Sequence, residues 1–236
     1  MLLRPRQKLF VERSLTALDK HQNTLGVAPT GAGKTIMLSG VTGQWLENEE
    51  AKACVLAHRD ELTTQNVVKF SRVNPSISTS IYDAKEKSWN GQTTFAMVQT
   101  LGRESNLKKM PKLDLLVIDE AHHAAAPTYR RIIDSVRDRN PDVAIFGVTA
   151  TPNRGDNKAL RPVFSNVSDQ ITLAELIQSG HLVPPRTYVV DVGIQGELSQ
   201  VKRTADDFDM AAVDAIMNKA PVTEAVIRHW KDKAHD

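Results

Sequence analysis

Eight residues near the N-terminus have the composition of a phosphate-binding loop. Residues 28–35 read Ala-Pro-Thr-Gly-Ala-Gly-Lys-Thr and lie between a short apolar stretch and a stretch with a helical pattern. Two glycines let backbone N–H groups turn toward an anion, and the start of a helix adds the positive end of its dipole. The segment therefore predicts a site for nucleotide phosphates, although Ala28 stands where the general pattern has a glycine.

The side chains of this loop suit the chemistry of a bound nucleotide. Lys34 is placed to reach the β- and γ-phosphates, and the Thr35 hydroxyl is placed to ligate Mg²⁺. The alternative is a glycine-rich turn that only links a strand to a helix, and the surrounding pattern favours the phosphate loop. The loop residues predicted to bind the cofactor are Thr30, Gly31, Ala32, Gly33, Lys34 and Thr35.

A second candidate site follows the strongly apolar stretch 113–118, which continues as Asp119-Glu120-Ala121-His122. Ligands of open α/β sheets bind at the C-terminal ends of the strands, so both carboxylates are placed for chemistry. Asp119 can hold Mg²⁺ through water, and Glu120 can polarise an attacking water molecule. A solvated acidic turn is the alternative, which the phosphate loop makes weaker. The predicted catalytic residues are therefore Lys34, Asp119 and Glu120.

Short apolar stretches alternate with helical patterns, which predicts βαβ units and a mostly parallel sheet with helices on both faces. Strands are predicted at 24–28, 53–57, 93–98, 113–118 and 143–148, and helices at 34–46, 60–70 and 128–139. Beyond these, the sequence predicts a loop at 153–157, a helix at 173–177, a strand at 187–192 and helices at about 205–218 and 221–233.

Composition narrows the class of protein. The 236 residues are 41% hydrophobic and 25% charged, which excludes wholesale disorder and a fibrous rod. No apolar run approaches the roughly 18 residues of a membrane span, and no signal-peptide core is present, so a cytoplasmic protein without a membrane partner is expected. Residues 1–20 and 103–112 carry an excess of basic side chains, which can meet phosphate backbones or simply be solvated.

Other reactive or aromatic side chains are assigned to packing or to the surface. His122 and His123 do not predict a zinc site, because Zn²⁺ needs three or four ligands and no helical i, i+4 pair is present. We expect His122 to hydrogen-bond the segment 148–152 or a neighbouring domain, and His123 to lie on the surface. Cys54 is predicted in the core, and packing is predicted for Trp45, Trp89 and Trp230.

Taken together, these motifs resemble the DEAH-box ATPases of helicase superfamily 2. Further segments resemble other motifs of that family and occur in the same order along the chain. They are Leu3–Gln7, Leu56–Leu62, Val98–Leu101 and Val148–Pro152. The resemblance covers about residues 1–190 and is closer to the type III restriction subunit and XPB-like branch than to DEAD-box RNA helicases. It implies a RecA-like P-loop NTPase domain over residues 1–192, with ATP and Mg²⁺ as cofactors.

The resemblance also implies roles outside the loop. Gln7 is implied as the residue that reads the purine, with Arg4 in the same segment. Residues implied to contact nucleic-acid phosphates are Arg59, Gln99 and Thr100, with a surface ion pair as the alternative for Arg59. Residues implied to couple the ATP site to the nucleic-acid groove are His122, Thr149 and Thr151, with strand-end capping as the alternative for the threonines.

Motors of this superfamily hydrolyse ATP between two RecA-like domains, the second of which supplies an arginine finger. Residues 193–236 are expected to form a helical segment that leads toward a second domain absent from this chain. The leading prediction is therefore the ATP-binding motor domain of a helicase or translocase on nucleic acid, with DNA favoured and little hydrolysis by the isolated domain. The alternatives are a double-strand translocase that does not unwind, and a nucleotide-binding switch or scaffold without turnover.

Overall fold

The computed structural model describes residues 3–47, 50–58, 60–152, 160–189, 191–202 and 209–233. Arg59 and the loop predicted at 153–157 lie outside the described residues. The chain forms two compact units, Met1–Val183 and Pro184–Asp236. The predicted domain boundary after residue 192 falls within the second unit.

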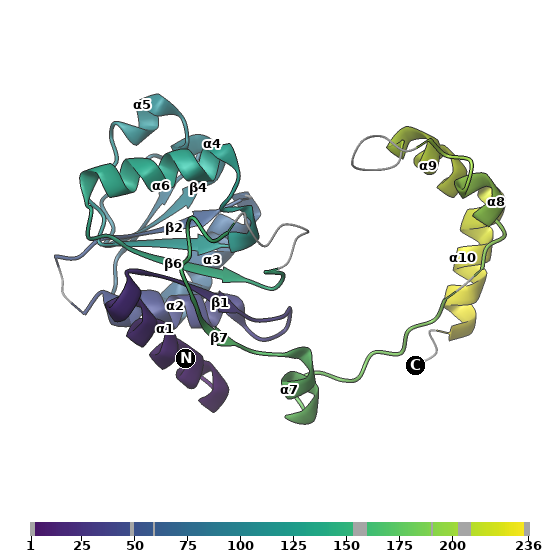
Figure 1. The fold of residues 1–236 in the computed structure, drawn as a ribbon, viewed down its shortest axis with the longest axis horizontal. Helices are drawn as coiled ribbons and strands as arrows, with labels where there is room; N and C mark the ends of the chain where they lie inside the picture. The colour runs from purple at the N-terminus through teal and green to yellow at the C-terminus, as the bar shows by residue number, and fades with distance from the viewer. Residues whose placement is uncertain are drawn as a thin grey trace. The chain divides into compact units, whose positions relative to one another are not determined.

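The first unit is built on one sheet of seven strands (Figure 1). They are β1 (Asn23–Val27), β2 (Ala53–Ala57), β3 (Thr79–Tyr82), β4 (Thr93–Met97), β5 (Leu115–Asp119), β6 (Ala144–Thr149) and β7 (Val167–Gln170). Their order is β3-β4-β2-β5-β6-β1-β7, and every neighbouring pair is parallel. The C-terminal ends of β5, β6 and β1 therefore lie side by side at one edge of the sheet.

Helices cover both faces of the sheet, which confirms the predicted α/β architecture (Figure 1). One face carries α1 (Pro5–His21), α2 (Lys34–Trp45) and α3 (Asp60–Val73). The other carries α4 (Val98–Leu101), α5 (Glu104–Leu107) and α6 (Pro127–Arg139). Buried side chains such as Phe10 and Met37 fill the first layer, and Ile132 and Val136 fill the second. The central strands β2, β5 and β6 are wholly buried between the layers, as their largely apolar sequences require.

The sequence patterns do not predict α1 or the edge strands β3 and β7. The two strands read Thr-Ser-Ile-Tyr and Val-Ser-Asp-Gln, so no apolar run marks either of them. The buried stripe of α1 includes Gln7 and Ser14 beside its apolar residues, which weakens the helical period of the pattern. A pattern of hydrophobic residues therefore does not reveal a helix or strand whose buried face includes polar residues.

The second unit contains α8 (Gln195–Leu198), α9 (Met210–Met217) and α10 (Ala220–Lys233). The two longer helices predicted there are confirmed over their described residues, and residues 205–208 of the first prediction lie outside them. The strand predicted at 187–192 is wrong, because the described residues of that range adopt no strand. Tyr188 and Val189 are 53% and 97% exposed, so the apolar pattern there has no neighbouring strand to pair with. The packing role predicted for Trp230 is also wrong, since it is 66% exposed.

The remaining packing predictions for the first unit are confirmed. Cys54 is fully buried in β2, and burial raises the pKa of its thiol. Trp45 and Trp89 are partly buried against the two core layers. Among the described residues, no helix is long and apolar enough to cross a membrane.

Candidate nucleotide-binding site

The phosphate loop connects β1 to α2 and depends on two glycines. Gly31 and Gly33 have φ angles of 88° and 86°, in the left-handed region that favours glycine. A Cβ on Gly31 would lie 2.8 Å from Leu182 Cδ2, and a Cβ on Gly33 would lie 2.5 Å from Gln7 Nε2. Both glycines are therefore needed for the backbone conformation and for close packing. The loop leads directly into α2, which begins at Lys34.

Asp119, the last residue of β5, is close enough to Lys34 to feel its positive charge. The side chain of Asp119 is buried, and this burial raises the pKa of its carboxyl. A hydrogen bond from Asn66 and the charge of Lys34 act in the opposite direction but do not restore the ordinary pKa. An incompletely compensated carboxylate therefore lies beside the phosphate loop.

Glu120 differs from its neighbour in exposure and backbone conformation. Its φ is 51°, which is uncommon for a residue other than glycine. This conformation turns the chain from β5 into the short helix η1 (Ala121–His123). The Glu120 side chain is 35% exposed, while its backbone N–H donates to Asp119 Oδ1 at 3.0 Å. The buried carboxylate suits a metal ligand, and the more exposed one suits a group that polarises water.

A buried threonine joins the acidic segment to the end of β6. His122 Nδ1 lies 3.0 Å from Thr149 Oγ1 and 3.4 Å from Glu120 Oε2. The Thr149 hydroxyl also accepts from the Thr151 backbone N–H at 3.2 Å. The hydrogen bond predicted between His122 and the segment 148–152 is present, and it runs through Thr149. Thr151 itself is exposed, and its backbone N–H provides this link.

His123 is not the surface residue that the sequence predicts. It is half-buried, and its ring stacks on that of His58 with centroids 4.8 Å apart. His58 follows β2 and His123 follows β5, which are adjacent strands. The sequence could not show this contact because it depends on strand order.

A cavity of about 510 Å³ lies beside the loop, between the start of α1 and α7 (Leu173–Gln178). Its volume falls in the range of about 300–1,000 Å³ that is usual for small-molecule sites. Gln7 lines the cavity and is buried, with Nε2 donating to Ala32 O at 2.9 Å and Oε1 accepting from Arg4 N at 3.0 Å. Gln7 thus ties the start of α1 to the phosphate loop, and the cavity is large enough for a nucleotide base.

An ion-pair network fixes the wall of this cavity, and the sequence reading missed it. Arg6 pairs with Asp169 of β7 and with Glu175 of α7, the latter at 3.3 Å, and Arg13 pairs with Asp169 at 2.8 Å. Burial alone would raise the pKa of Asp169, but the hydrogen bonds and charges of Arg6 and Arg13 hold it below its ordinary value. The Glu175 carboxylate also accepts the backbone N–H of Thr172, the residue that caps the N-terminus of α7. No local pattern signals these partners, because Arg6 and Asp169 are 163 residues apart.

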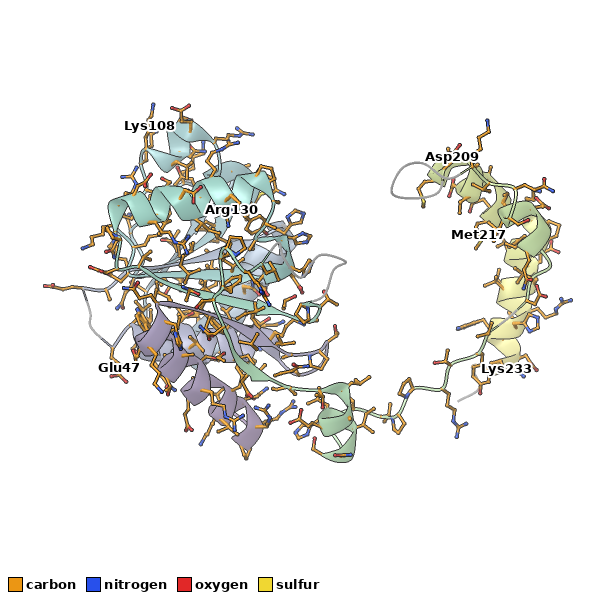
Figure 2. All side chains as sticks on the ribbon, viewed as in Figure 1. Glu47, Lys108, Arg130, Asp209, Met217 and Lys233 are labelled. Carbon is orange, nitrogen blue, oxygen red and sulfur yellow. The ribbon has the colours of Figure 1, made fainter. Side chains whose placement is uncertain are left out.

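The two described residues predicted to contact nucleic acid differ in exposure. Gln99 is exposed in α4, which follows β4, but Thr100 is only 5% exposed and its hydroxyl contacts Met97 Sδ at 3.9 Å. In the basic segment 103–112, Lys108 projects outward from the end of α5 (Figure 2) and pairs with Glu104 at 3.1 Å. Of the two described candidates, Gln99 is therefore the better placed to reach a phosphate.

The parallel sheet, the glycine loop after β1 and the acidic segment after β5 together define a RecA-like P-loop NTPase domain. The chain belongs to the family of the type III restriction enzyme res subunit, whose family model matches residues 1–154. This membership confirms the resemblance to superfamily 2 that the sequence motifs indicated.

Comparisons with single proteins agree. The chain is 28% identical over 248 residues to IRC3 of Saccharomyces cerevisiae, named as an ATP-dependent helicase, and the match covers 100% of this chain and 35% of that protein. The chain thus spans about a third of that relative's length. The Hef helicase domain of Pyrococcus furiosus has a TM-score of 0.60 at 20% identity, over 71% of this chain and 38% of that one. The SWI2/SNF2 ATPase core of Sulfolobus solfataricus, solved with double-stranded DNA, has a TM-score of 0.56 at 18% identity, over 70% of this chain and 35% of that one.

Proposed function

We propose that this chain is the ATP-binding motor domain of an ATP-dependent helicase or translocase that acts on nucleic acid, with DNA as the favoured substrate. The observation that carries the proposal is that the glycine loop after β1, which ends in Lys34, and the buried carboxylate of Asp119 at the end of β5 lie at the same edge of the parallel sheet. A cation that reaches phosphates and an anion that attracts a metal are the two charges that a Mg²⁺–nucleotide complex requires.

The nucleotide is held along the edge formed by β1, β5 and β6. Backbone N–H groups of the loop and Lys34 bind the β- and γ-phosphates. The base enters the cavity that Gln7 lines, where the tie from Gln7 to Ala32 fixes the distance between base and phosphates. Base and phosphate recognition are thus joined by one buried amide.

The residues at this edge fit Mg²⁺, which prefers oxygen ligands. The Thr35 hydroxyl and the Asp119 carboxylate would hold it, directly or through water. The burial that raises the pKa of Asp119 also leaves its negative charge poorly solvated, so a cation beside it is favoured. When bound, Mg²⁺ neutralises charge on the phosphates. Glu120, whose side chain is partly exposed, would polarise the attacking water. His122 lies near the Glu120 carboxylate and hydrogen-bonds Thr149, so it would couple the two residues.

Turnover is proposed to need a second RecA-like domain. An arginine finger contributes about 10³–10⁵ in rate, and within its described residues the second unit of this chain holds helices and no strand. We expect little ATPase activity from residues 1–236 alone, with DNA barely raising it, as measured by phosphate release. Strong DNA-stimulated turnover by this chain would contradict the requirement for a second domain.

The nucleic-acid partner is proposed to contact the C-terminal edge of the sheet through phosphates rather than bases, which gives weak and sequence-indifferent binding. Gln99 is exposed there, and Arg59 is proposed as its companion. The complex of the SWI2/SNF2 neighbour with double-stranded DNA supports DNA as the substrate.

The proposal is tested by titration calorimetry of the chain with ADP and ATP in the presence of Mg²⁺. Replacement Lys34→Ala removes the cation that faces the phosphates, and binding should be lost. Replacement Lys20→Ala removes an exposed lysine in the last turn of α1 and should leave the affinity unchanged. Equal affinity of the Lys34→Ala and wild-type proteins would overturn the nucleotide site.

A further inference from the structure

The carboxylate of Asp119 receives a hydrogen bond from a residue that no motif contains. Asn66 lies in α3, is only 2% exposed, and donates from Nδ2 to Asp119 Oδ2 at 3.3 Å. The other oxygen, Oδ1, accepts the backbone N–H of Glu120 at 3.0 Å. Each carboxylate oxygen thus has its own donor, one from the neighbouring residue and one from a helix 53 residues earlier in the chain.

Two fixed donors determine how the plane of this carboxylate is turned. The terminal torsion of an aspartate has a broad range of allowed values, so the intrinsic preference of the side chain does not fix the plane of its carboxylate. The backbone N–H of Glu120 holds only Oδ1, and Asn66 supplies the second point that defines the plane. Carboxylates that ligate metals are commonly oriented by such hydrogen bonds, and loss of the partner typically costs about 10–100-fold in metal affinity.

We propose that Asn66 is a positioning residue, which orients the Asp119 carboxylate for the Mg²⁺ ion of a bound nucleotide. The inference rests on the proposed function, in which Asp119 holds that ion. Asn66 does not touch the nucleotide or the metal and acts only through Asp119. Its helix, α3, begins at Asp60, directly after Arg59, so the same helix that carries Asn66 starts at the segment proposed to face nucleic acid.

The hydrogen bond could also serve only to satisfy two buried polar groups. That role and the positioning role differ in one measurable respect. A purely structural bond would affect nucleotide affinity equally with and without Mg²⁺, because the fold is the same in both conditions. A positioning bond would change only the part of the affinity that Mg²⁺ supplies.

The experiment is a titration of the chain with a fluorescent ADP analogue, in excess MgCl₂ and in EDTA. The variants are Asn66→Ala, which removes the side chain, and Asn66→Leu, which keeps most of the volume without the donor. The matched control is Asn74→Ala, because Asn74 directly follows α3 and donates from Nδ2 to Ser39 O at 2.8 Å, away from Asp119. Thermal unfolding of each protein identifies a variant that does not fold, and Asn66→Ser then replaces it.

In both Asn66 variants we expect the gain in affinity for the ADP analogue that Mg²⁺ supplies to be about tenfold smaller than in the wild type. In EDTA the affinity of both variants should match that of the wild type. The Asn74→Ala protein should keep the full gain. In the background of Asp119→Ala, which itself removes the gain, adding Asn66→Leu should have no further effect, because the residue acts through that carboxylate.

Two results would overturn the inference alone, while leaving the nucleotide site standing. One is a full Mg²⁺ gain in both Asn66 variants. The other is an equal loss of affinity in MgCl₂ and in EDTA, which would assign the bond to packing. A wild-type protein whose ADP affinity does not respond to Mg²⁺ would instead overturn the proposed function, and this inference with it.

Discussion

The phosphate half and the base half of the candidate site are built in different ways. The phosphate half consists of one contiguous loop at 28–35 and the end of the central strand β5. The base half is assembled from the start of α1, the edge strand β7 and the short helix α7, which are far apart in the chain. The first half is specified by local backbone geometry, and the second by ion pairs between distant residues.

The two halves also hold their buried aspartates differently. Burial raises the pKa of Asp119, and its partners do not restore it, whereas two arginines hold the pKa of Asp169 below its ordinary value. The charged carboxylate of Asp119 thus lowers the stability of the folded protein, whereas that of Asp169 raises it. The difference indicates that the phosphate half is arranged for a ligand and the base half for a rigid wall.

Replacing Asp169 should damage the base half most. Asp169→Asn leaves Arg6 and Arg13 without their shared carboxylate, and we expect the free energy of unfolding to fall by about 1–3 kcal/mol, less than for a fully buried pair because the arginines are partly exposed. Urea unfolding at pH 7 measures this. The control is Asp138→Ala, an exposed aspartate of α6, which should change stability little.

The pH dependence of this effect has a definite sign. Because the folded pKa of Asp169 is lowered, its contribution to stability is present above the unfolded pKa of about 3.9 and is lost as the pH falls through the folded value. The difference in stability between wild type and Asp169→Asn should therefore be constant from about pH 5 to 8 and shrink below about pH 4. A difference that instead grows in acid would contradict the ion-pair account.

Replacement Gln7→Ala should separate recognition of the base from that of the phosphates. We expect ATP to bind about tenfold more weakly, equivalent to about 1.4 kcal/mol, because the cavity loses its buried amide. Inorganic tripolyphosphate, which has no base, should lose less affinity. Competition titrations with both ligands measure the two effects, and equal losses would mean that the two halves are not distinct.

The smallest expected effect has the opposite sign to that of Asp169. Asp119→Asn removes a buried charge whose raised pKa reflects incomplete compensation, so stability at pH 7 in EDTA should rise by about 0.5–1 kcal/mol. The gain should shrink as the pH falls toward the folded pKa of Asp119, where the wild-type carboxyl takes up a proton. A loss of stability at pH 7 would remove the contrast between the two aspartates.

What the sequence could predict follows the same division. The glycines of the loop and the carboxylates after β5 were predicted because strand, turn and helix are contiguous and the backbone requirement at Gly31 and Gly33 is local. The strand β7 and the helix α1 were not, because buried polar residues such as Asp169 of β7 and Ser14 of α1 have partners more than a hundred residues away. The strand predicted at 187–192 failed for the converse reason, since an apolar run forms no strand without a neighbour.

The measurement that tests the account most directly is photo-crosslinking of the chain with 8-azido-ATP, followed by mapping of the labelled peptide. If base and phosphates bind as one nucleotide across both halves, the label should fall in the peptides around residues 4–7 or 171–182, and Lys34→Ala should abolish it. Labelling elsewhere in the chain, or labelling at the cavity that persists in the Lys34→Ala protein, would contradict a single nucleotide site.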